Sequence, residues 1–211
     1  MLSDTGDLDA ALALAQQGDE SGFCELWRGL HPRLLRYLRI VGCEDPDDVA
    51  GETWLQVVRD LEKFRGGDAD FRRWLFTIGR NRAIDAARSR SRRPVTPVCT
   101  GLEVLPDDRH VEDDVLEGIA TRRALTLVAG LSKDQAEAVA LRVLAGLETA
   151  HVAQILGKSS GSVRVALHRG LRTLAADPDV RSLAGALPPG RPAGAGMSSG
   201  SEQPAGPAVR R

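Results

Sequence analysis

Apolar residues recur along the chain with the spacing of α-helices. In the segment 71–93, Phe71, Trp74, Leu75 and Ile78 stand at positions i, i+3, i+4 and i+7, which share one face of a helix. Similar spacing runs through the segments 7–17, 20–41, 46–61, 115–130, 136–144, 149–156 and 160–174. No segment alternates apolar and polar residues in the manner of a half-buried strand. The pattern therefore predicts an all-α protein.

Breaks in this pattern divide the predicted helices into two groups. Residues 95–114 contain prolines and scattered acids without periodicity, and we interpret them as a flexible linker. Residues 178–211 are mainly Gly, Pro, Ala and Ser, which cannot bury enough apolar surface to order the chain. The sequence thus predicts two small helical domains, 7–94 and 115–177, joined by the linker and followed by a disordered tail.

Arginine is concentrated in the predicted helix 71–93, which holds eight arginines and one acid, Asp85. Arg73 and Arg80 are seven residues apart and share a face, and their guanidinium groups offer planar forks of donors that suit phosphate. Aromatic rings on which unpaired bases can stack lie in and before this run: Phe64, Phe71, Trp74 and Phe76. The helix is a candidate nucleic-acid binding element, and a solvated basic helix is the plainer alternative.

The segment 149–174 has the pattern of a helix-turn-helix. Ala153 is small where two helices would cross, Gly157 can take the turn, and Val163 faces the core from the second helix. Such a unit lays its second helix in the major groove of DNA. The DNA contacts expected from this helix are Ser160, Ser162, Arg164, Val165, His168, Arg169 and Arg172, of which the last two are better placed for phosphates. An ordinary helical hairpin with a basic face is the alternative.

Charge and cysteine usage narrow the class of protein further. The net charge is only −1, but acids and bases are segregated, and the segment 40–58 holds five acids and no Lys or Arg. The three cysteines are far apart and form no C-x-x-C pair, so we expect no metal site and no disulfide framework. The acidic N-terminus does not resemble a signal peptide, and no apolar run reaches the ~18–20 residues of a membrane span. We expect a cytoplasmic protein without membrane insertion and without a cofactor.

Two strings of residues, in this order, resemble the bacterial sigma-70 family and within it the small extracytoplasmic-function (ECF) sigma factors. The first is W-L-x-x-I-x-R-N-x-A-I-D at 74–85, typical of sigma region 2, and the second is G-S-V-R-x-x-L-H-R at 161–169, typical of region 4. The resemblance covers roughly 11–176. It implies a protein that binds core RNA polymerase, reads the −35 element of promoter DNA with region 4 and melts the −10 element with region 2. It also implies an anti-sigma factor as a partner, and we expect a monomer when the protein is free.

The resemblance assigns roles to individual residues of region 2. The loop 64–70 would hold a flipped base of the −10 element. The −10 contacts implied are Phe64, Asp68, Arg72, Arg73, Trp74, Arg80, Asn81, Arg88 and Arg90. The core polymerase contacts implied are Asp47, Asp48, Val49, Glu52, Thr53, Trp54 and Leu55. A plain core position is an equal alternative for Trp54, and we expect Asp85 on the buried side of its helix.

Two other functions fit parts of the sequence. An operator-binding regulator could use the same helix-turn-helix without engaging core polymerase, but it would leave the acidic segment 45–52 and the arginine-rich helix unexplained. A magnesium-dependent nuclease would need clustered acids, whereas Asp45, Asp47 and Asp48 do not share a helical face. We therefore expect a protein that is not an enzyme.

Overall fold

The computed structural model of the 211-residue chain describes residues 5–91, 113–178 and 180. In this part of the chain every regular element is helical, which confirms the all-α prediction. The elements are α1 (Thr5–Gln16), α2 (Glu20–Ile40), α3 (Pro46–Asp60), the 3-10 turn η1 (Leu61–Lys63), α4 (Asp68–Ser91), α5 (Asp113–Ala129), α6 (Lys133–Val143), α7 (Thr149–Leu156) and α8 (Ser160–Ala176). Most of the predicted linker and nearly all of the predicted tail lie outside the described residues.

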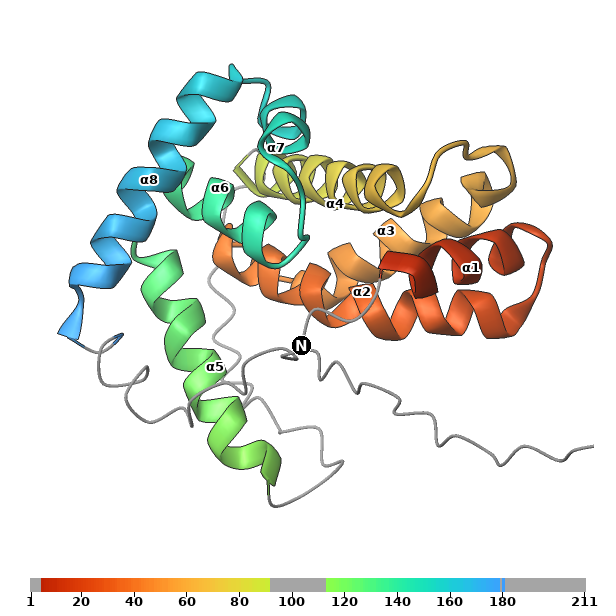
Figure 1. Cartoon of the computed structure of the whole chain (residues 1–211), viewed down its shortest axis with the longest axis horizontal. Helices are drawn as coiled ribbons and strands as arrows, with labels where there is room; N and C mark the ends of the chain where they lie inside the picture. The colour runs from red at the N-terminus through yellow and green to blue at the C-terminus, as the bar shows by residue number, and fades with distance from the viewer. Residues whose placement is uncertain (1–4, 92–112, 179, 181–211) are drawn as a thin grey trace, which may run out of the picture.

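Helix α2 is the centre of the N-terminal unit, which comprises α1 to α4 (Figure 1). Leu30, Leu34 and Leu38 recur every fourth residue along α2 and are fully buried. Pro32 lies inside the helix on its exposed side. Helix α1 packs so closely on α2 that a Cβ added to Gly22 would stand 2.6 Å from the carbonyl oxygen of Ala11. The backbones of α1 and α2 are thus in direct contact at Gly22.

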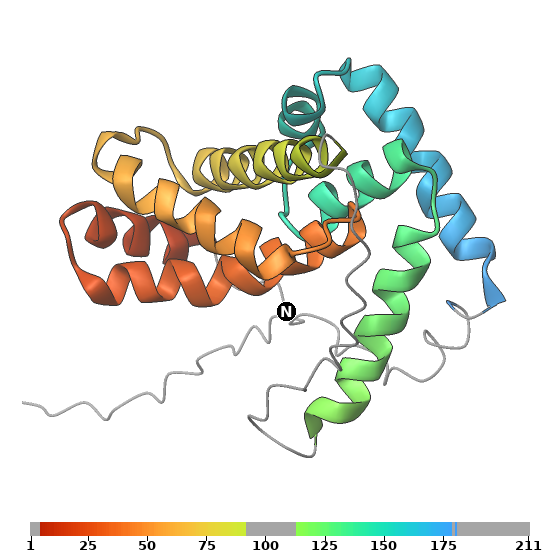
Figure 2. The same ribbon diagram turned by 180° about the vertical axis from the view of Figure 1, so that it is seen from behind.

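The C-terminal unit, α5 to α8, is built around α6 and the helix-turn-helix formed by α7 and α8 (Figure 2). Val163 of α8 is almost fully buried and Ala153 of α7 is buried, as the sequence pattern predicts. Gly157 ends α7 with a left-handed backbone (φ 63°), and the amide of Lys158 donates to the carbonyl of Ala153 at 3.0 Å. The turn between the two helices is therefore set by local chemistry.

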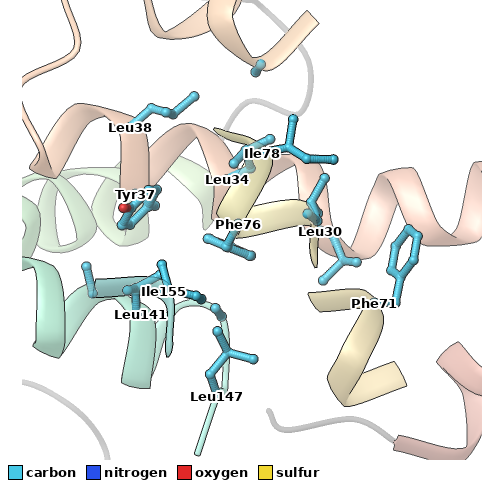
Figure 3. Packing of buried hydrophobic residues seen from close by; sticks show 14 of the residues in the cluster. Leu30, Leu34, Tyr37, Leu38, Phe71, Phe76, Ile78, Leu141, Leu147 and Ile155 are labelled. Carbon is cyan, nitrogen blue, oxygen red and sulfur yellow. The ribbon is translucent and has the colours of Figure 1, made fainter. Parts of the chain in front are cut away.

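The two units pack against each other through a shared apolar core. Tyr37 of α2 and Phe76 of α4 meet edge to face, with ring centroids 5.5 Å apart, and both are fully buried. Leu141 of α6 and Leu147 of the α6–α7 turn approach them from the C-terminal unit (Figure 3). The sequence left the placement of the two domains open because of the linker, and the structure joins them through these side chains.

Helices α4 and α6 begin three residues before the segments 71–93 and 136–144 that the sequence predicts, and the helix starts differ in their capping contacts. Ser159 caps α8 by accepting a hydrogen bond from the amide of Ser162 at 3.2 Å. Asp45 and Ser132 precede α3 and α6, but neither side chain caps its helix. Aspartate directly before a helix commonly caps it, but Asp45 pairs instead with Arg90 of α4 at 2.9 Å.

We predict opposite effects for two glycine-to-alanine substitutions. Gly22→Ala should destabilise the protein by about 1–3 kcal/mol, because the new methyl group meets the backbone of α1. Gly51→Ala should stabilise it by up to about 1 kcal/mol, because the position is helical and nothing lies within 4 Å of the added Cβ. Urea unfolding of the two variants and the parent protein measures both effects. Equal midpoints for the two variants would contradict the close packing of α1 on α2.

Candidate nucleic-acid interface

The outward face of α8 presents the residues expected to read DNA. Ser159 holds the first turn of the helix, and Val163 and Gly170 anchor its other side against the C-terminal unit. The segment from Thr149 to Ala176 contains no acid, so the charged side chains of α8 itself are all basic. Ser160 is partly buried. The other six expected residues are exposed: Ser162, Arg164, Val165, His168, Arg169 and Arg172. The face is therefore open along its whole length.

The arginines of α4 stand in a different situation, because several already have partners inside the protein. Arg72 donates to the carboxylate of Asp68 at 2.6 Å and to the carbonyl oxygen of Ala145 at 3.2 Å. Asp68 is buried, and Arg72 reaches the C-terminal unit through the turn at Gly146. A Cβ added to Gly146 would stand 2.6 Å from the Nη1 atom of Arg72. The turn thus leaves just enough room for this guanidinium group.

Arg80 forms the second polar bridge between the two units. Its Nε atom lies 3.2 Å from Oε1 of Glu137 on α6, and the Glu137 side chain is only 8% exposed. Burial chiefly, and the nearby Glu137 carboxylate next, raise the pKa of Tyr37 far above its ordinary value, so its hydroxyl stays protonated. The bridge therefore places a paired charge beside the shared apolar core.

The remaining arginines of α4 are paired with acids of the N-terminal unit. Arg73 pairs with Asp70 at 3.2 Å, and Arg90 pairs with Glu44 at 3.2 Å. Asp85 is exposed and pairs with Arg88 at 3.6 Å, so the expectation that it lies on the buried side of the helix is wrong. It shares a face with Ile78, seven residues earlier, but this face becomes exposed toward the end of α4. Asn81 is exposed.

An aromatic cluster lies where α4 begins. Phe64 stacks on Trp74 with ring centroids 5.1 Å apart and an interplanar angle of 24°, and its ring meets Phe71 edge to face. Phe71 is buried, whereas Phe64 and Trp74 are partly exposed. Because α4 starts at Asp68, the predicted loop 64–70 is shorter, at 64–67. The partly exposed pair borders this loop.

The residues expected to contact core polymerase fall into two groups on α3. Asp47, Asp48, Glu52 and Leu55 are exposed, and they share the outer side of the helix. The other three are buried: Val49, Thr53 and Trp54. Trp54 packs against Phe23 and Trp27, so it occupies the core position that the sequence gave as an alternative. Thr53 donates a hydrogen bond to the carbonyl of Val49 at 2.7 Å.

Two further residues, Glu137 and Val58, bear on this interface although the sequence did not predict them. Glu137 stands alone among apolar neighbours in the string AEAVA, and a charge on an otherwise apolar helix face is a signal for a buried partner. Val58 is exposed one turn after Leu55 on α3 and extends its apolar strip, which the i, i+3 spacing could have indicated.

Among the described residues, no three His, Cys, Asp or Glu side chains gather closely enough to hold a metal ion. None of the described helices has the length and apolar character needed to cross a membrane.

Two family models match the chain. Sigma-70 region 2 matches residues 26–93, and sigma-70 region 4 matches residues 121–174. The ECF RNA polymerase sigma factor BldN of Streptomyces coelicolor is 32% identical over 175 residues, which cover 82% of this chain and 66% of BldN. The ECF RNA polymerase sigma factor SigD of Mycobacterium tuberculosis is 32% identical over 173 residues, which cover 79% of this chain and 82% of SigD.

Solved structures agree on the fold. The structure of CnrH in complex with the cytosolic domain of CnrY matches with a TM-score of 0.54 and 23% identity, over 87% of this chain and 99% of that one. The sigma factor RpoE in complex with the anti-sigma factor NepR from Bartonella quintana matches with a TM-score of 0.50 and 20% identity, over 78% and 97%. These identities support the fold alone. With both family models in chain order and SigD matched over most of its length, the chain belongs to the ECF sigma factors of the sigma-70 family.

Proposed function

We propose that this sigma factor acts in the cytoplasm, binds core RNA polymerase and directs it to promoters, with domain 7–94 reading the −10 element and domain 115–177 the −35 element. The observation that carries this division is the open, acid-free face of α8 on a chain that also carries the arginine-rich helix α4. Sigma factors are initiation factors and not enzymes. Melting needs no covalent step, because tighter binding of the unpaired strand than of the duplex shifts the equilibrium.

At the −35 element, the first turns of α8 would enter the major groove. Ser162, Arg164 and Val165 lie near the N-terminus of the helix, where side chains of a recognition helix reach base edges. Arg169 and Arg172 lie further along the same exposed side and would contact phosphates.

At the −10 element, the loop 64–67 and the Phe64–Trp74 pair would receive an unpaired base. The two partly exposed rings offer a stacking surface, and Arg73 and Asn81 lie on the following turns of α4. Arg72 and Arg80 are held by Asp68 and Glu137 in this arrangement, so DNA phosphates must replace these partners. We therefore infer that the two units separate when the −10 element is engaged.

Core polymerase would contact the outer side of α3. The exposed acids there suit a basic partner surface, and the exposed Leu55 and Val58 add an apolar strip beside them. Val49, Thr53 and Trp54 would support this surface from beneath. An operator-binding regulator does not bind core polymerase and would not need such a surface. The match to sigma region 2 also disfavours that alternative.

We further propose that an anti-sigma factor holds the protein, otherwise a monomer, until a signal releases it. An apolar groove of about 300 Å³ runs between α2, α5, α6 and α8, and Val143 and Leu171 at its edge are exposed. Two similar proteins were solved with partners, CnrH with CnrY and RpoE with an anti-sigma factor. An apolar helix seated in this groove would keep the two units together.

Run-off transcription with core polymerase on a pool of genomic promoter fragments tests the proposed function. We expect discrete new starts that depend on this protein. Arg164→Ala should weaken −35 binding by ~1–3 kcal/mol, which is a loss of about fivefold to 150-fold, because one base contact is removed. Arg123→Ala removes the same charge from an exposed site on α5 and should leave the starts unchanged. DNA binding without any redirected transcription would favour the operator-binding regulator.

Glu137→Gln should increase binding to the −10 element by about tenfold, or ~1.4 kcal/mol, the order of one charge-assisted hydrogen bond. The substitution weakens the bridge to Arg80 and raises the population with separated units. Fluorescence anisotropy with a single-stranded −10 oligonucleotide measures the change. Glu25→Gln, at an exposed site on α2, is the charge-matched control. An unchanged affinity in Glu137→Gln would contradict the inferred separation.

A further inference from the structure

Helix α1 precedes the segment that matches sigma region 2, which begins at residue 26, yet it contacts both ends of the loop 64–67. We propose that Asp9 and Gln16 of α1 are positioning residues that set the shape of this loop, and with it the choice of the unpaired base that the loop accepts. The inference deepens the proposed function, because it rests on the loop and the Phe64–Trp74 pair as the −10 site.

Gln16 holds the first end of the loop. Its side-chain amide donates to the carbonyl oxygen of Phe64 at 2.8 Å and to that of Leu61 at 3.3 Å. One amide group thus satisfies both ends of the 3-10 turn η1, 45 and 48 residues away along the chain. This hydrogen bond restrains the backbone at the residue from which the Phe64 ring projects.

Asp9 holds the second end of the loop. Its Oδ1 atom accepts a hydrogen bond of 2.6 Å from the amide of Asp68, the first residue of α4. The first amides of a helix lack partners within it, and a carboxylate from another helix satisfies one of them here. A Cβ added to Gly67 would stand 3.2 Å from this same Asp9 oxygen, so the loop passes close to α1.

The support behind these two contacts is rigid. Ala11, Leu12 and Ala15 of α1 are buried against the core of the N-terminal unit, and Gly22 brings the backbones of α1 and α2 together. Asp9 and Gln16 are seven residues apart and therefore project from the same side of α1. Helix α1 is thus a rigid support that forms a hydrogen bond with each end of the loop.

The loop carries the aromatic pair between these two ties. Phe64 follows the turn held by Gln16, and Trp74 lies on the helix whose start is held by Asp9. Loss of either tie would let one ring move relative to the other. A binding site loses selectivity when its groups move by more than about 0.5 Å, even where the contacts themselves remain possible.

The test measures base selectivity by full-length protein bound to core polymerase. The probe is a set of single-stranded oligonucleotides with each of the four bases at every position of a −10 element selected by the parent protein. Gln16→Glu places an acceptor against two carbonyls, and its matched control is Gln17→Glu, one residue away and exposed. Asp9→Ala removes the other tie, and Asp9→Asn keeps an acceptor oxygen.

We expect Gln16→Glu and Asp9→Ala to reduce discrimination at one position of the −10 strand by about fivefold to tenfold, on the scale of one mismatched base. Gln17→Glu and Asp9→Asn should retain the discrimination of the parent. Affinity for duplex −35 DNA should be unchanged in all four variants, because α8 is not touched.

Two outcomes would overturn the inference in different ways. If the parent protein selects a base and both Gln16→Glu and Asp9→Ala select it equally well, α1 does not position the loop, while the proposed function stands. If the parent shows no preference at any position of the unpaired strand, the proposed −10 site fails and the inference fails with it. Equal loss of −10 and −35 binding in the tie variants would indicate general unfolding and would also contradict a positioning role.

Discussion

One helix, α4, packs into the apolar core shared by the two units while carrying much of the chain's arginine. Phe71 and Leu75 bury one part of it in the N-terminal unit, and Phe76 faces Tyr37 and the C-terminal unit. A charged side chain beside such a core is unfavourable unless it is paired. Arg72 and Arg80 stand at this boundary, and each has a carboxylate partner. Arg80 pairs with Glu137 of α6, and Arg72 also donates to the carbonyl of Ala145, so α4 contributes polar as well as apolar contacts to the junction of the two units.

This constraint makes the two basic surfaces, on α8 and on α4, unequal. The face of α8 is exposed and free of acids, so any anionic partner gains the full benefit of its charge. On α4, an arginine that already pairs with a carboxylate exchanges one anion for another when it contacts a phosphate. The net gain in binding free energy is therefore smaller than on α8. A protein in this state would meet the −35 element more readily than the −10 element, and the order of engagement would follow from the packing.

The loop before α4 also depends on contacts between residues far apart in the sequence. Its ends are held by side chains of α1 that lie 48 and 59 residues earlier in the chain. Loops that carry function are commonly positioned by a rigid scaffold, because their own backbone has few internal contacts. Here the scaffold is a short helix, and its stiffness depends on the close approach of two backbones at Gly22.

The sequence by itself determined the helices, the helix-turn-helix and the identity of the basic faces. Helical period, the small Ala153 and the buried Val163 are local features, and neighbours in the chain suffice to specify them. Tertiary structure alone decided that Trp54 is a core residue, that Asp45 pairs with Arg90 instead of capping its helix, and that Glu137 meets Arg80. These outcomes join residues as many as 57 positions apart, and no local period carries information about which distant charge or ring will lie opposite.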